Sequence, residues 1–379
     1  INKDMHKKYT SLGLMSGTSG EGVDASIIDS NGIDQFEVIK DKYFEYDSDI
    51  YQDIHNFKEK ILNIKDLEKY SKELLDLERK ITLFHAKVIN QLKLNNKDIL
   101  VGFHGQTIYH NPKEKISRQL GDEKLLYQLT QKKIIFDFRK NDIQNGGEGA
   151  PLAPIFHQLI ATQKKIILPV CVLNIGGISN ITIIKKKIGS EELYSKDIGP
   201  GNCLIDSWVR KNSNKKFDRD GKLALSGKKN DIIFEQAQEL YANRINKKKL
   251  SFDTNDFDIS FARGLSLEDG AKILTDFTAS IIGHEISSSL LKIDNSVKDI
   301  LICGGGRKNK VLVKKIKENL STNINLKLID DYNIDGDFIE SQAFAFLAIR
   351  SILKLPISFP KTTGCLKSCS GGELTEKLD

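Results

Sequence analysis

The chain has 379 residues and a formal net charge of +6, from 57 Lys and Arg against 51 Asp and Glu. This length exceeds what one compact core usually holds, so two domains of roughly 150–200 residues are expected. The positive charge comes from many scattered lysines, and Asp and Glu are nearly as numerous, which argues against nucleic-acid binding. We interpret the lysine runs at 185–187 and 247–249 as solvated surface.

The sequence favours a soluble cytoplasmic protein that does not engage a membrane. Its first ten residues are polar and lack the apolar stretch of a signal peptide. The longest uncharged apolar run, 166–178, is broken by Pro169 and is shorter than the roughly 20 residues of a membrane helix. The five cysteines are therefore expected to be reduced thiols.

Cys365 and Cys369 have the spacing of half a zinc site. A complete site needs further ligands, and no second cysteine pair or nearby histidine supplies them along the sequence. We therefore interpret the pair as packing residues and predict no metal ligands in this chain.

In chain order, the first predicted element is a hairpin. The stretches Leu12–Met15 and Val23–Ile28 have the apolar patterns of strands, and Ser16–Gly22 joins them. Three glycines and three hydroxyl residues in this turn let backbone and side-chain donors converge on one point. Such a turn suits phosphate oxygens, although an ordinary glycine-rich hairpin explains the stretch equally well.

The rest of the first half alternates helices and strands. Apolar residues at helical spacing predict one long amphipathic helix over 66–94. Further predicted elements are a strand at 99–103, a helix at 121–131, a strand at 134–137 and a helix at 154–163.

A second half of the same kind follows. Its strands are predicted at 170–175, 181–184, 194–198 and 300–303, and its helices at 204–210, 232–241, 267–291 and 339–353. Two such halves predict domains at 1–165 and 166–379, with a final helix and tail able to pack back on the first domain. A ligand is expected in the cleft between them.

Three glycine loops follow predicted strands, where α/β folds bind their ligands. They are NIGGISN at 174–180, DIGPGN at 197–202 and CGGGRKN at 303–309. The first two are compact enough to present backbone donors to phosphate, and the third precedes a helix whose N-terminus can hold a nucleotide. None has the spacing of a Rossmann or Walker motif.

Phosphate-type turns in both halves, with an adenosine-type glycine turn late in the second, resemble the actin, Hsp70 and sugar-kinase superfamily. Within it, the chain resembles the 1,6-anhydro-N-acetylmuramic acid kinases. Segments in the order seen in that family span residues 12 to about 366 and read GLMSGTSGEGVDA, GFHGQTIYHNP, DFRKNDIQNGGEGAPLAPIFHQ, LNIGGISNIT, DIGPGNCLIDSW, FDRDG, CGGGRKN and ESQAFAFLAIR.

The resemblance implies an α/β chain with the two-domain actin-like (ribonuclease H-like) ATPase fold and an interdomain active-site cleft. It also implies a homodimer that uses ATP and Mg²⁺ to phosphorylate 1,6-anhydro-N-acetylmuramic acid and hydrolyse its 1,6-anhydro bond. The products are N-acetylmuramic acid 6-phosphate and ADP, in peptidoglycan recycling. Because O6 of this sugar is tied to the anomeric carbon, water attacks C1 while O6 captures the γ-phosphoryl group.

The resemblance assigns catalysis to Asp197 and Glu340. Asp197 matches the family's general base for the attacking water; alternatively, it caps the turn before Gly199. Glu340 matches a sugar-site acid that orients the same water or a sugar hydroxyl; alternatively, it only favours the start of a helix.

Substrate binding is expected from four residues of the first half. Arg139 is expected to pair with the lactyl carboxylate, with Lys140 as the second cation, or alternatively to bridge Asp142. His104 and Gln106 are expected beside the sugar or the phosphates, with a structural role for His104 nearly as well supported. The nucleotide is expected to contact Ser16, Gly17, Thr18, Ser19, Gly20, Glu21, Gly22, Val23, Gly176, Gly177, Asn202, Gly304, Gly305, Gly306 and Asn309.

The opening turn departs from the family pattern at one acidic position. The family usually reads T-S-L-D-G, and this chain has Glu21 in place of the aspartate. The extra methylene moves the carboxylate by about 1.5 Å and alters a water-mediated Mg²⁺ contact. Glu21 favours a second hypothesis, a nucleotide-gated sensor of wall fragments without turnover. A third hypothesis is a sugar kinase of the same fold that acts on a free hydroxyl.

Overall fold

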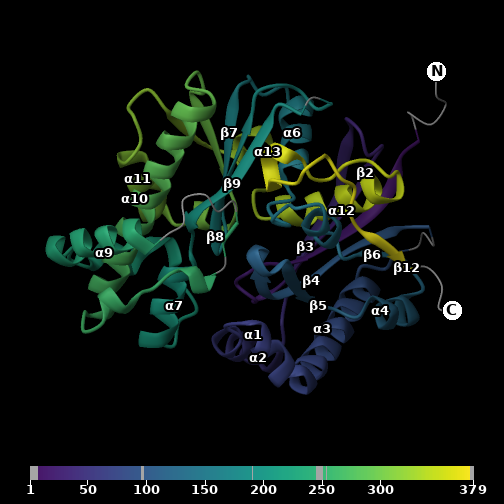
Figure 1. Ribbon diagram of the computed structural model, residues 1–379, viewed down its shortest axis with the longest axis horizontal. Helices are drawn as coiled ribbons and strands as arrows, with labels where there is room; N and C mark the ends of the chain where they lie inside the picture. The colour runs from purple at the N-terminus through teal and green to yellow at the C-terminus, as the bar shows by residue number, and fades with distance from the viewer. Residues whose placement is uncertain (1–6, 95–97, 190, 245–250, 253, 376–379) are drawn as a thin grey trace. The chain divides into compact units, whose positions relative to one another are not determined.

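The computed structural model of this chain describes residues 7–94, 98–189, 191–244, 251–252 and 254–375. Residues 1–6 of the polar start and the lysine run at 247–249 lie outside the described residues. The described elements form two separate sheets with helices packed against them, which confirms the predicted α/β class (Figure 1).

Contacts divide the chain into two compact units. The first comprises Ile1–Ile166, Lys186–Leu193 and Phe338–Asp379, and the second comprises Ile167–Lys185 and Tyr194–Asp337. The final helix and tail therefore belong to the first unit. The predicted domains, 1–165 and 166–379, remain a prediction about which parts of the chain fold by themselves.

The first unit is built on a seven-stranded sheet with the order β12-β6-β4-β1-β2-β3 and with β5 beside β4. The strands are β1 (Tyr9–Ser16), β2 (Gly22–Ser30), β3 (Phe36–Glu45), β4 (Leu100–Asn111), β5 (Ile116–Leu120), β6 (Lys133–Phe136) and β12 (Glu373–Thr375). Strand β1 pairs antiparallel with β2, with Leu12 opposite Ile27, and this confirms the predicted hairpin. Strand β1 also pairs parallel with β4, so the two strands run toward the same edge of the sheet.

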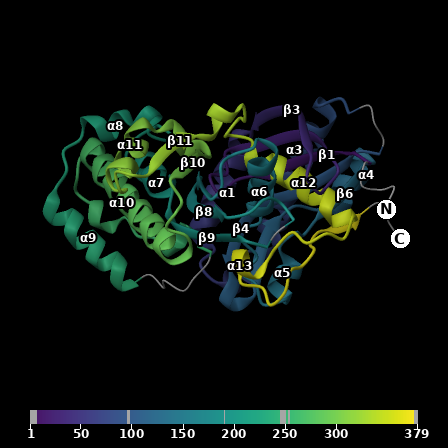
Figure 2. The same cartoon turned by 90° about the horizontal axis from the view of Figure 1, so that it is seen from above.

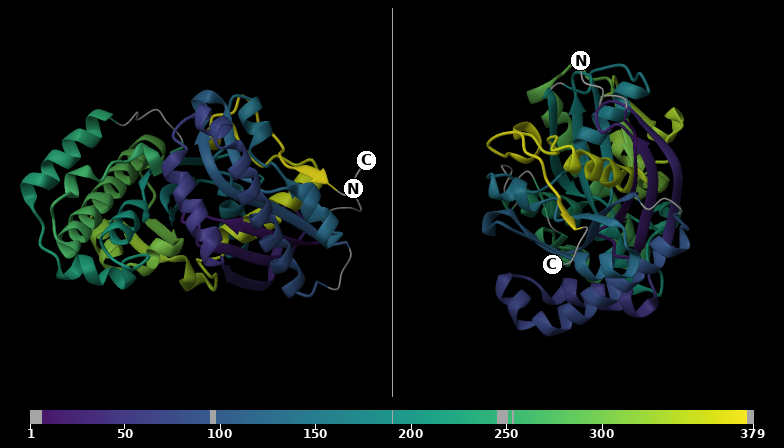
Figure 3. Two further views of the ribbon diagram at one scale, coloured as in Figure 1. Left: turned by 90° about the horizontal axis from the view of Figure 1, so that it is seen from below. Right: turned by 90° about the vertical axis from the view of Figure 1, so that its right-hand side faces the viewer.

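Helices cover both faces of this sheet. They are α1 (Ser48–Lys60), α2 (Ile64–Lys69), α3 (Ser71–Gln91), α4 (Glu123–Thr130), α5 (Lys140–Gln144), α6 (Pro154–Gln163), α12 (Ile339–Ile352) and α13 (Pro360–Thr363). Leu12 and Leu14 of β1 join the core that α1 and α3 cover. Because side chains alternate along a strand, Gly13 faces the other way, toward α12. Figures 2 and 3 show the helices of this unit packed around its strands.

Two paired glycines let α12 approach the sheet closely. Gly13 of β1 lies opposite Gly102 of β4 in the parallel register. A Cβ atom on Gly13 would lie 1.8 Å from the carbonyl oxygen of Ser341, and one on Gly102 would lie 2.4 Å from that of Phe344. Both positions therefore need glycine, because the helix backbone occupies the space of a side chain.

The structure corrects two predictions in the first half. The single helix predicted over 66–94 is two helices, α2 and α3, which meet at Tyr70 with φ −102° and ψ 20°. The apolar spacing continues across this break, so periodicity does not reveal it. The strand predicted at 99–103 extends to Asn111, because β5 pairs with its second part.

The second unit is built on a five-stranded sheet with the order β11-β10-β7-β8-β9. Its strands are β7 (Val170–Ile175), β8 (Ile178–Ile184), β9 (Leu193–Pro200), β10 (Asp299–Cys303) and β11 (Asn325–Leu328). Strand β10 is parallel to both β7 and β11, whereas β8 is antiparallel to β7. The strands predicted at 170–175, 181–184, 194–198 and 300–303 are thus confirmed within a few residues.

Five α-helices accompany the second sheet: α7 (Cys203–Asn212), α8 (Lys222–Ser226), α9 (Asp231–Arg244), α10 (Leu267–Ile293) and α11 (Lys310–Glu318). Helix α10 is 27 residues long, and Phe277 and Ile282 on it lie in the core of this unit with Trp208 of α7. Of the helices in the described part of the chain, none has both the length and the apolar character needed to cross a bilayer.

We predict that replacing Gly13 with alanine destabilises the protein strongly. The new methyl group would have to displace the backbone of α12, and overpacking of this kind costs about 1–3 kcal/mol or more. Gly17→Ala is the matched control, because a Cβ atom there meets no atom within 4 Å. Urea unfolding should show a loss for Gly13→Ala and little change for Gly17→Ala; equal stabilities would contradict the close approach of α12.

We also predict that acid weakens the fold through buried histidines. Burial lowers the pKa of His85 and of His157 to about 4. An unfolded histidine has a pKa of about 6.5, so the unfolded state takes up protons first and stability falls as the pH drops from about 6.5 toward 4. Each residue is expected to cost about 2 kcal/mol at pH 5 relative to neutral pH.

The His85→Gln variant tests this pH dependence because glutamine does not titrate. Its free energy of unfolding should change less between pH 7 and pH 5 than that of the parent protein. An identical pH profile in the two proteins would show that His85 is not the group responsible.

Candidate active site

The turn of the opening hairpin is tied together by the side chain of Ser16. Its hydroxyl oxygen lies 2.6 Å from Gln106 Oε1, 3.0 Å from the carbonyl oxygen of Gly22 and 2.8 Å from the Tyr46 hydroxyl, and its single proton serves one of these acceptors at a time. Gln106 Nε2 donates in turn to the carbonyl oxygen of Gly17 at 3.1 Å. Gln106 is fully buried, so in this structure its amide supports the turn; its predicted contact with substrate stays a prediction.

The backbone of the turn is tightly folded at one end and open at the other. Gly20 has φ +66°, and a Cβ atom there would lie 2.7 Å from Ile54 of α1. Gly17 has no atom within 4 Å of its Cβ position, so a ligand can approach its backbone. Val23 is fully buried in the core, which leaves only its main chain for a ligand.

One cation near this turn escaped the sequence analysis. The ammonium group of Lys58, in the last turn of α1, donates a hydrogen bond to the carbonyl oxygen of Thr18. The turn therefore carries a positive charge as well as converging donors. Lys58 is 40 residues from Thr18 in sequence, and no motif links the two.

Arg139 and His104 form a hydrogen-bonded pair in the first unit. Arg139 Nη2 lies 2.9 Å from His104 Nε2, and Arg139 Nε lies 3.3 Å from the same atom. Arg139 Nη1 donates to the carbonyl oxygen of Gly149 at 2.7 Å. Because an arginine only donates, His104 Nε2 must accept, which places the imidazole proton on Nδ1, 2.8 Å from the carbonyl oxygen of Gly105.

The charge of Arg139 acts on two titratable neighbours. Burial and the arginine charge hold the pKa of His104 well below its usual range, so the ring is neutral. Burial raises the pKa of Glu340, and the charge of Arg139 opposes that rise. Glu340 lies in the first turn of α12, and Phe344 of the same helix packs on the His104 ring at a centroid distance of 4.7 Å.

Lys140 is engaged away from this pair. Its ammonium group lies 2.8 Å from Glu373 Oε1 on β12 and 3.6 Å from Asp137 Oδ2. These two carboxylates raise the pKa of Lys140. Lys140 is exposed, and its predicted action as a second cation for the substrate stays a prediction.

In the second unit, two glycine loops close on each other at the end of β7. The amides of Gly201 and Asn202 donate to the carbonyl oxygens of Gly177 and Gly176 at 2.9 and 2.8 Å. A Cβ atom on Gly201 would lie 2.2 Å from the carbonyl oxygen of Gly176. These two amides thus build the loops themselves, and other groups must supply any phosphate contact.

The third glycine loop packs on the same strand end. A Cβ atom on Gly304, which has φ +80°, would lie 2.6 Å from the carbonyl oxygen of Ile175, and one on Gly306 would lie 2.2 Å from the Ile175 side chain. Gly305 between them has no atom within 4 Å of its Cβ position. All three predicted loops therefore converge at the carboxyl end of β7, with Gly305 as the open backbone position.

Arg307 holds this loop in place through hydrogen bonds. Its guanidinium holds Asp330 through two hydrogen bonds of 2.8 and 2.9 Å and Asp337 through one of 2.5 Å. It also reaches the carbonyl oxygen of Gly304 at 3.1 Å. Asn309, which the sequence assigns to the nucleotide, accepts a hydrogen bond from the amide of Leu312 at 3.0 Å and so caps α11.

Asp197 lies in β9 with 8% of its surface exposed. Its Oδ2 accepts a hydrogen bond of 2.7 Å from the amide of Phe252, 55 residues away in sequence. The carboxylate is therefore oriented by a distant loop. The alternative prediction, a cap on the turn before Gly199, does not account for this contact.

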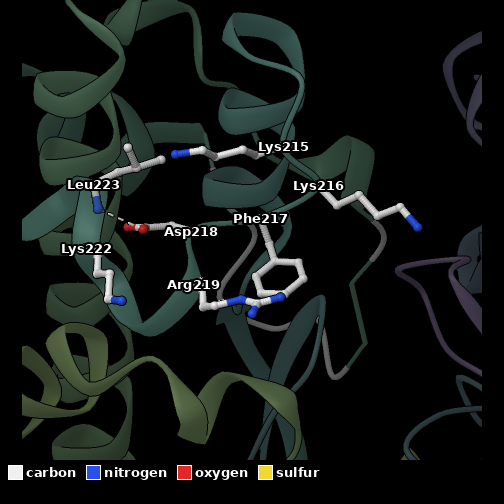
Figure 4. A pocket seen from close by; sticks show the side chains of 7 residues that line it. All are labelled: Lys215, Lys216, Phe217, Asp218, Arg219, Lys222 and Leu223. Atoms are coloured by element: carbon white, nitrogen blue, oxygen red, sulfur yellow. Dashed lines mark hydrogen bonds between the residues drawn. The ribbon is translucent and has the colours of Figure 1, made fainter.

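A basic pocket of about 520 Å³ lies on the second unit (Figure 4). Arg219 lies against the Phe217 ring, with 6.0 Å between the guanidinium carbon and the ring centroid. Asp218 accepts hydrogen bonds from the amides of Leu223 and Ala224 at 2.8 and 3.0 Å. The residues that line the pocket are Lys215, Lys216, Phe217, Asp218, Arg219, Lys222 and Leu223.

Gly221, which follows the lining residue Arg219 by two positions, packs against the third glycine loop, and a Cβ atom there would lie 2.4 Å from Asn309 Oδ1. The segment FDRDG carries the family resemblance, but the pocket itself was not predicted from the sequence. The signal was available in the run KKFDR, which places cations on both sides of an aromatic residue.

The structure thus groups the candidate residues by unit. In the first unit, β4 joins the Ser16 turn to His104, and His104 is bound to Arg139 beside Glu340. In the second, the loops that contain Gly176, Gly201 and Gly305 meet at β7. The two groups lie in different units of the chain.

Comparisons with known proteins give one consistent result. A family model described as anhydro-N-acetylmuramic acid kinase matches residues 9–377. The anhydro-N-acetylmuramic acid kinase of Pelagibacter ubique is 55% identical over 374 residues, which cover 98% of this chain and 100% of the relative. Proteins with the same name from Zymomonas mobilis and Agrobacterium fabrum are 34% and 33% identical, over 96% and 98% of this chain and 98% and 99% of their own lengths.

Among solved structures, the activator of the 2-hydroxyisocaproyl-CoA dehydratase from Clostridium difficile with bound ADPNP is a distant likeness. It aligns with 90% of this chain and 94% of its own, at 11% identity and a TM-score of 0.41. A likeness at this level carries no inference about this chain.

We predict that Arg307 matters more to stability than its neighbour Lys308, although both bind Asp337. The Arg307 side chain is 6% exposed and holds several carboxylates, whereas that of Lys308 is 64% exposed. Arg307→Met should cost about 2–3 kcal/mol, below the 3–5 kcal/mol of a fully buried pair because the aspartates are partly exposed. Lys308→Met, the matched control, should cost less than about 1 kcal/mol.

Urea unfolding of the two variants checks this prediction. A loss for Lys308→Met as large as that for Arg307→Met would show that burial of the guanidinium does not set the strength of this network.

Proposed function

Because this chain belongs to the anhydro-N-acetylmuramic acid kinase family, we propose that it converts 1,6-anhydro-N-acetylmuramic acid, ATP and water into N-acetylmuramic acid 6-phosphate and ADP. The match over residues 9–377, with relatives that align over nearly their whole lengths, is the observation that carries this function. The enzyme is a phosphotransferase of peptidoglycan recycling.

The substrate decides the order of bond changes. O6 of the anhydro sugar is bonded to C1 and carries no proton, so it cannot be activated by deprotonation. Water attacks C1, the C1–O6 bond breaks, and O6 takes the γ-phosphoryl group as it gains negative charge. The proton of the attacking water goes to a general base, and ADP leaves.

We assign the role of general base to Asp197. The hydrogen bond from Phe252 to Oδ2 orients its carboxylate, and its low exposure limits competition from bulk water. General bases of this kind contribute about 10²–10⁴-fold to rate. A carboxylate within reach of a water molecule at C1 suits this step.

Arg139 is proposed to bind the lactyl carboxylate of the sugar. Arg139 donates to His104 Nε2 and to the carbonyl oxygen of Gly149, and these two neutral acceptors orient its guanidinium. An arginine held in this way favours an incoming carboxylate. Glu340 is proposed to orient the water or a sugar hydroxyl, and the raised pKa of its carboxyl group suits a hydrogen-bonding role.

ATP is proposed to approach the chain at its open glycines. Gly17 and Gly305 present backbone where a Cβ atom would meet nothing within 4 Å, and the turns around them are fixed by Ser16 and Arg307. The basic pocket beside Asn309 adds charge that suits a nucleotide. Mg²⁺, when bound, would neutralise phosphate charge, and Glu21 is the residue of the opening turn with a carboxylate to hold it, directly or through water.

The other two hypotheses are not favoured. The matching family model is described as an anhydro-N-acetylmuramic acid kinase, which favours neither a sensor without turnover nor a kinase that acts on free hydroxyls. The homodimer remains a proposal that follows from the family resemblance, and the cytoplasmic location remains a proposal made from the sequence. The reaction also requires the two groups of residues to act on one ATP–sugar pair, and this too is part of the proposal.

We predict that Asp197→Asn lowers the turnover of anhydro sugar by at least about 100-fold while ATP still binds. Asparagine keeps the size of the side chain and an acceptor for Phe252, but it cannot take a proton. The matched control is Asp299→Asn. Asp299 lies on β10 and forms an ion pair with Lys327 of β11, so this variant should keep its activity. ADP release and calorimetric ATP titration measure the two quantities.

Full activity in Asp197→Asn would show that Asp197 is not the general base, and the proposed overall reaction would still stand. A parent protein that releases no ADP with the anhydro sugar, yet does so with simple hexoses, would instead contradict the proposed function.

A further inference from the structure

Three side chains of the kinds that bind metals meet inside the first unit, and none of them belongs to the candidate active site. Asp142 of α5 lies with Cys365 and Cys369 of the tail, and their Oδ and Sγ atoms are all within 4.8 Å of one another. The residues are 1%, 2% and 6% exposed. The sequence does not show this cluster, because Asp142 and Cys369 are 227 residues apart.

The tail is held against α5 by its backbone. The amide of Glu148 donates to the carbonyl oxygen of Thr363 at 2.8 Å, and that of Leu366 donates to Asn145 at 3.0 Å. Figure 2 shows α13 beside α5. Cys369 is fixed from its other side by hydrogen bonds with the main chain of Ser358. The cluster therefore sits on a scaffold that brings both cysteines to Asp142.

The carboxylate of Asp142 is buried with neutral donors. Within the described residues, its side chain accepts from the Thr363 hydroxyl at 2.6 Å, the Gly149 amide at 2.7 Å and the Cys369 thiol at 3.9 Å. A buried carboxylate with neutral partners and two thiols beside it is a site where a cation is favourable.

The distances suit a small thiophilic cation. Tetrahedral zinc, with Zn–S of about 2.3 Å and Zn–O of about 2.0–2.2 Å, places sulfur and oxygen ligands about 3.6 Å apart and two sulfurs about 3.8 Å apart. The 3.9 Å between Cys369 Sγ and Asp142 Oδ1 is close to the first value. The other ligand pairs, within 4.8 Å, need to shorten by about 1 Å at most.

We propose that Asp142, Cys365 and Cys369 form a structural site for a thiophilic divalent cation such as Zn²⁺. The cation forms bonds to two sulfurs and one carboxylate oxygen, and the two thiols release their protons to solvent. One dication replaces two protons, so binding leaves the net charge of the buried cluster unchanged. This site is independent of the proposed kinase reaction.

The cation would join the tail to the segment that follows Arg139. Helix α5 begins directly after Arg139, and Gly149, which accepts from Arg139 through its carbonyl oxygen, donates its amide to Asp142. The metal site thus stabilises the segment between Arg139 and Gly149. Each cysteine must lose its proton to bind the cation, so binding should tighten as the pH rises.

Cobalt titration of the reduced full-length protein tests this proposal. We expect one Co²⁺ per chain, with a thiolate charge-transfer band and two protons released per ion in weak buffer. Zn²⁺ should displace the Co²⁺. Cys365→Val/Cys369→Leu should lose the charge-transfer band, whereas Cys171→Ala, a buried cysteine of the second unit, should keep it.

Asp142→Asn provides the second test. Outer-shell partners alone are worth about 10–100-fold in metal affinity, so loss of a ligand should weaken Co²⁺ binding at least about tenfold. Circular dichroism shows that each variant is folded, and the single Cys365→Ser and Cys369→Ser variants replace the double variant if it is not.

Two results would overturn the proposal. They are the absence of a charge-transfer band in the reduced parent protein and a band that survives in the folded double variant.

Discussion

The contact of the α12 backbone with Gly13 and Gly102 is the constraint on which the candidate residues of the first unit depend. Strand β1 leads from Gly13 into the Ser16 turn, β4 carries His104 two residues after Gly102, and α12 begins beside Glu340. If α12 stood off by the width of a side chain, Phe344 would leave the His104 ring and Glu340 would leave Arg139. The close spacing of His104, Arg139 and Glu340 therefore depends on glycine at the two positions where α12 meets the sheet.

The second unit uses glycine in a related way. Gly201 packs against Gly176, and Gly304 and Gly306 pack against Ile175 at the end of β7. Arg307 donates to the carbonyl oxygen of Gly304 while it also binds aspartates of its own unit. The tightly packed glycines fix the loops, whereas Gly305, with free space at its Cβ position, leaves its backbone accessible to a ligand. This division explains how a segment with so much conformational freedom can still present one defined surface.

Local features were predictable from the sequence, and contacts between distant residues were not. The Ser16 hairpin and the strand–loop order around β7 follow from apolar alternation and glycine placement. The break at Tyr70 leaves the apolar spacing intact, so no pattern marks it. The pairing of Arg139 with His104, the cap formed by Asn309 and the cluster around Asp142 depend on tertiary packing, which one sequence does not reveal.

The central claim, that water opens the sugar while phosphate goes to O6, is tested most directly by a short reaction in H₂¹⁸O. The account predicts one ¹⁸O in the sugar at C1 and none in phosphate, above the exchange seen when unlabelled product stands in the same water for the same time. Label in inorganic phosphate with an unlabelled, unchanged sugar would mean that water attacks ATP, and it would contradict the account.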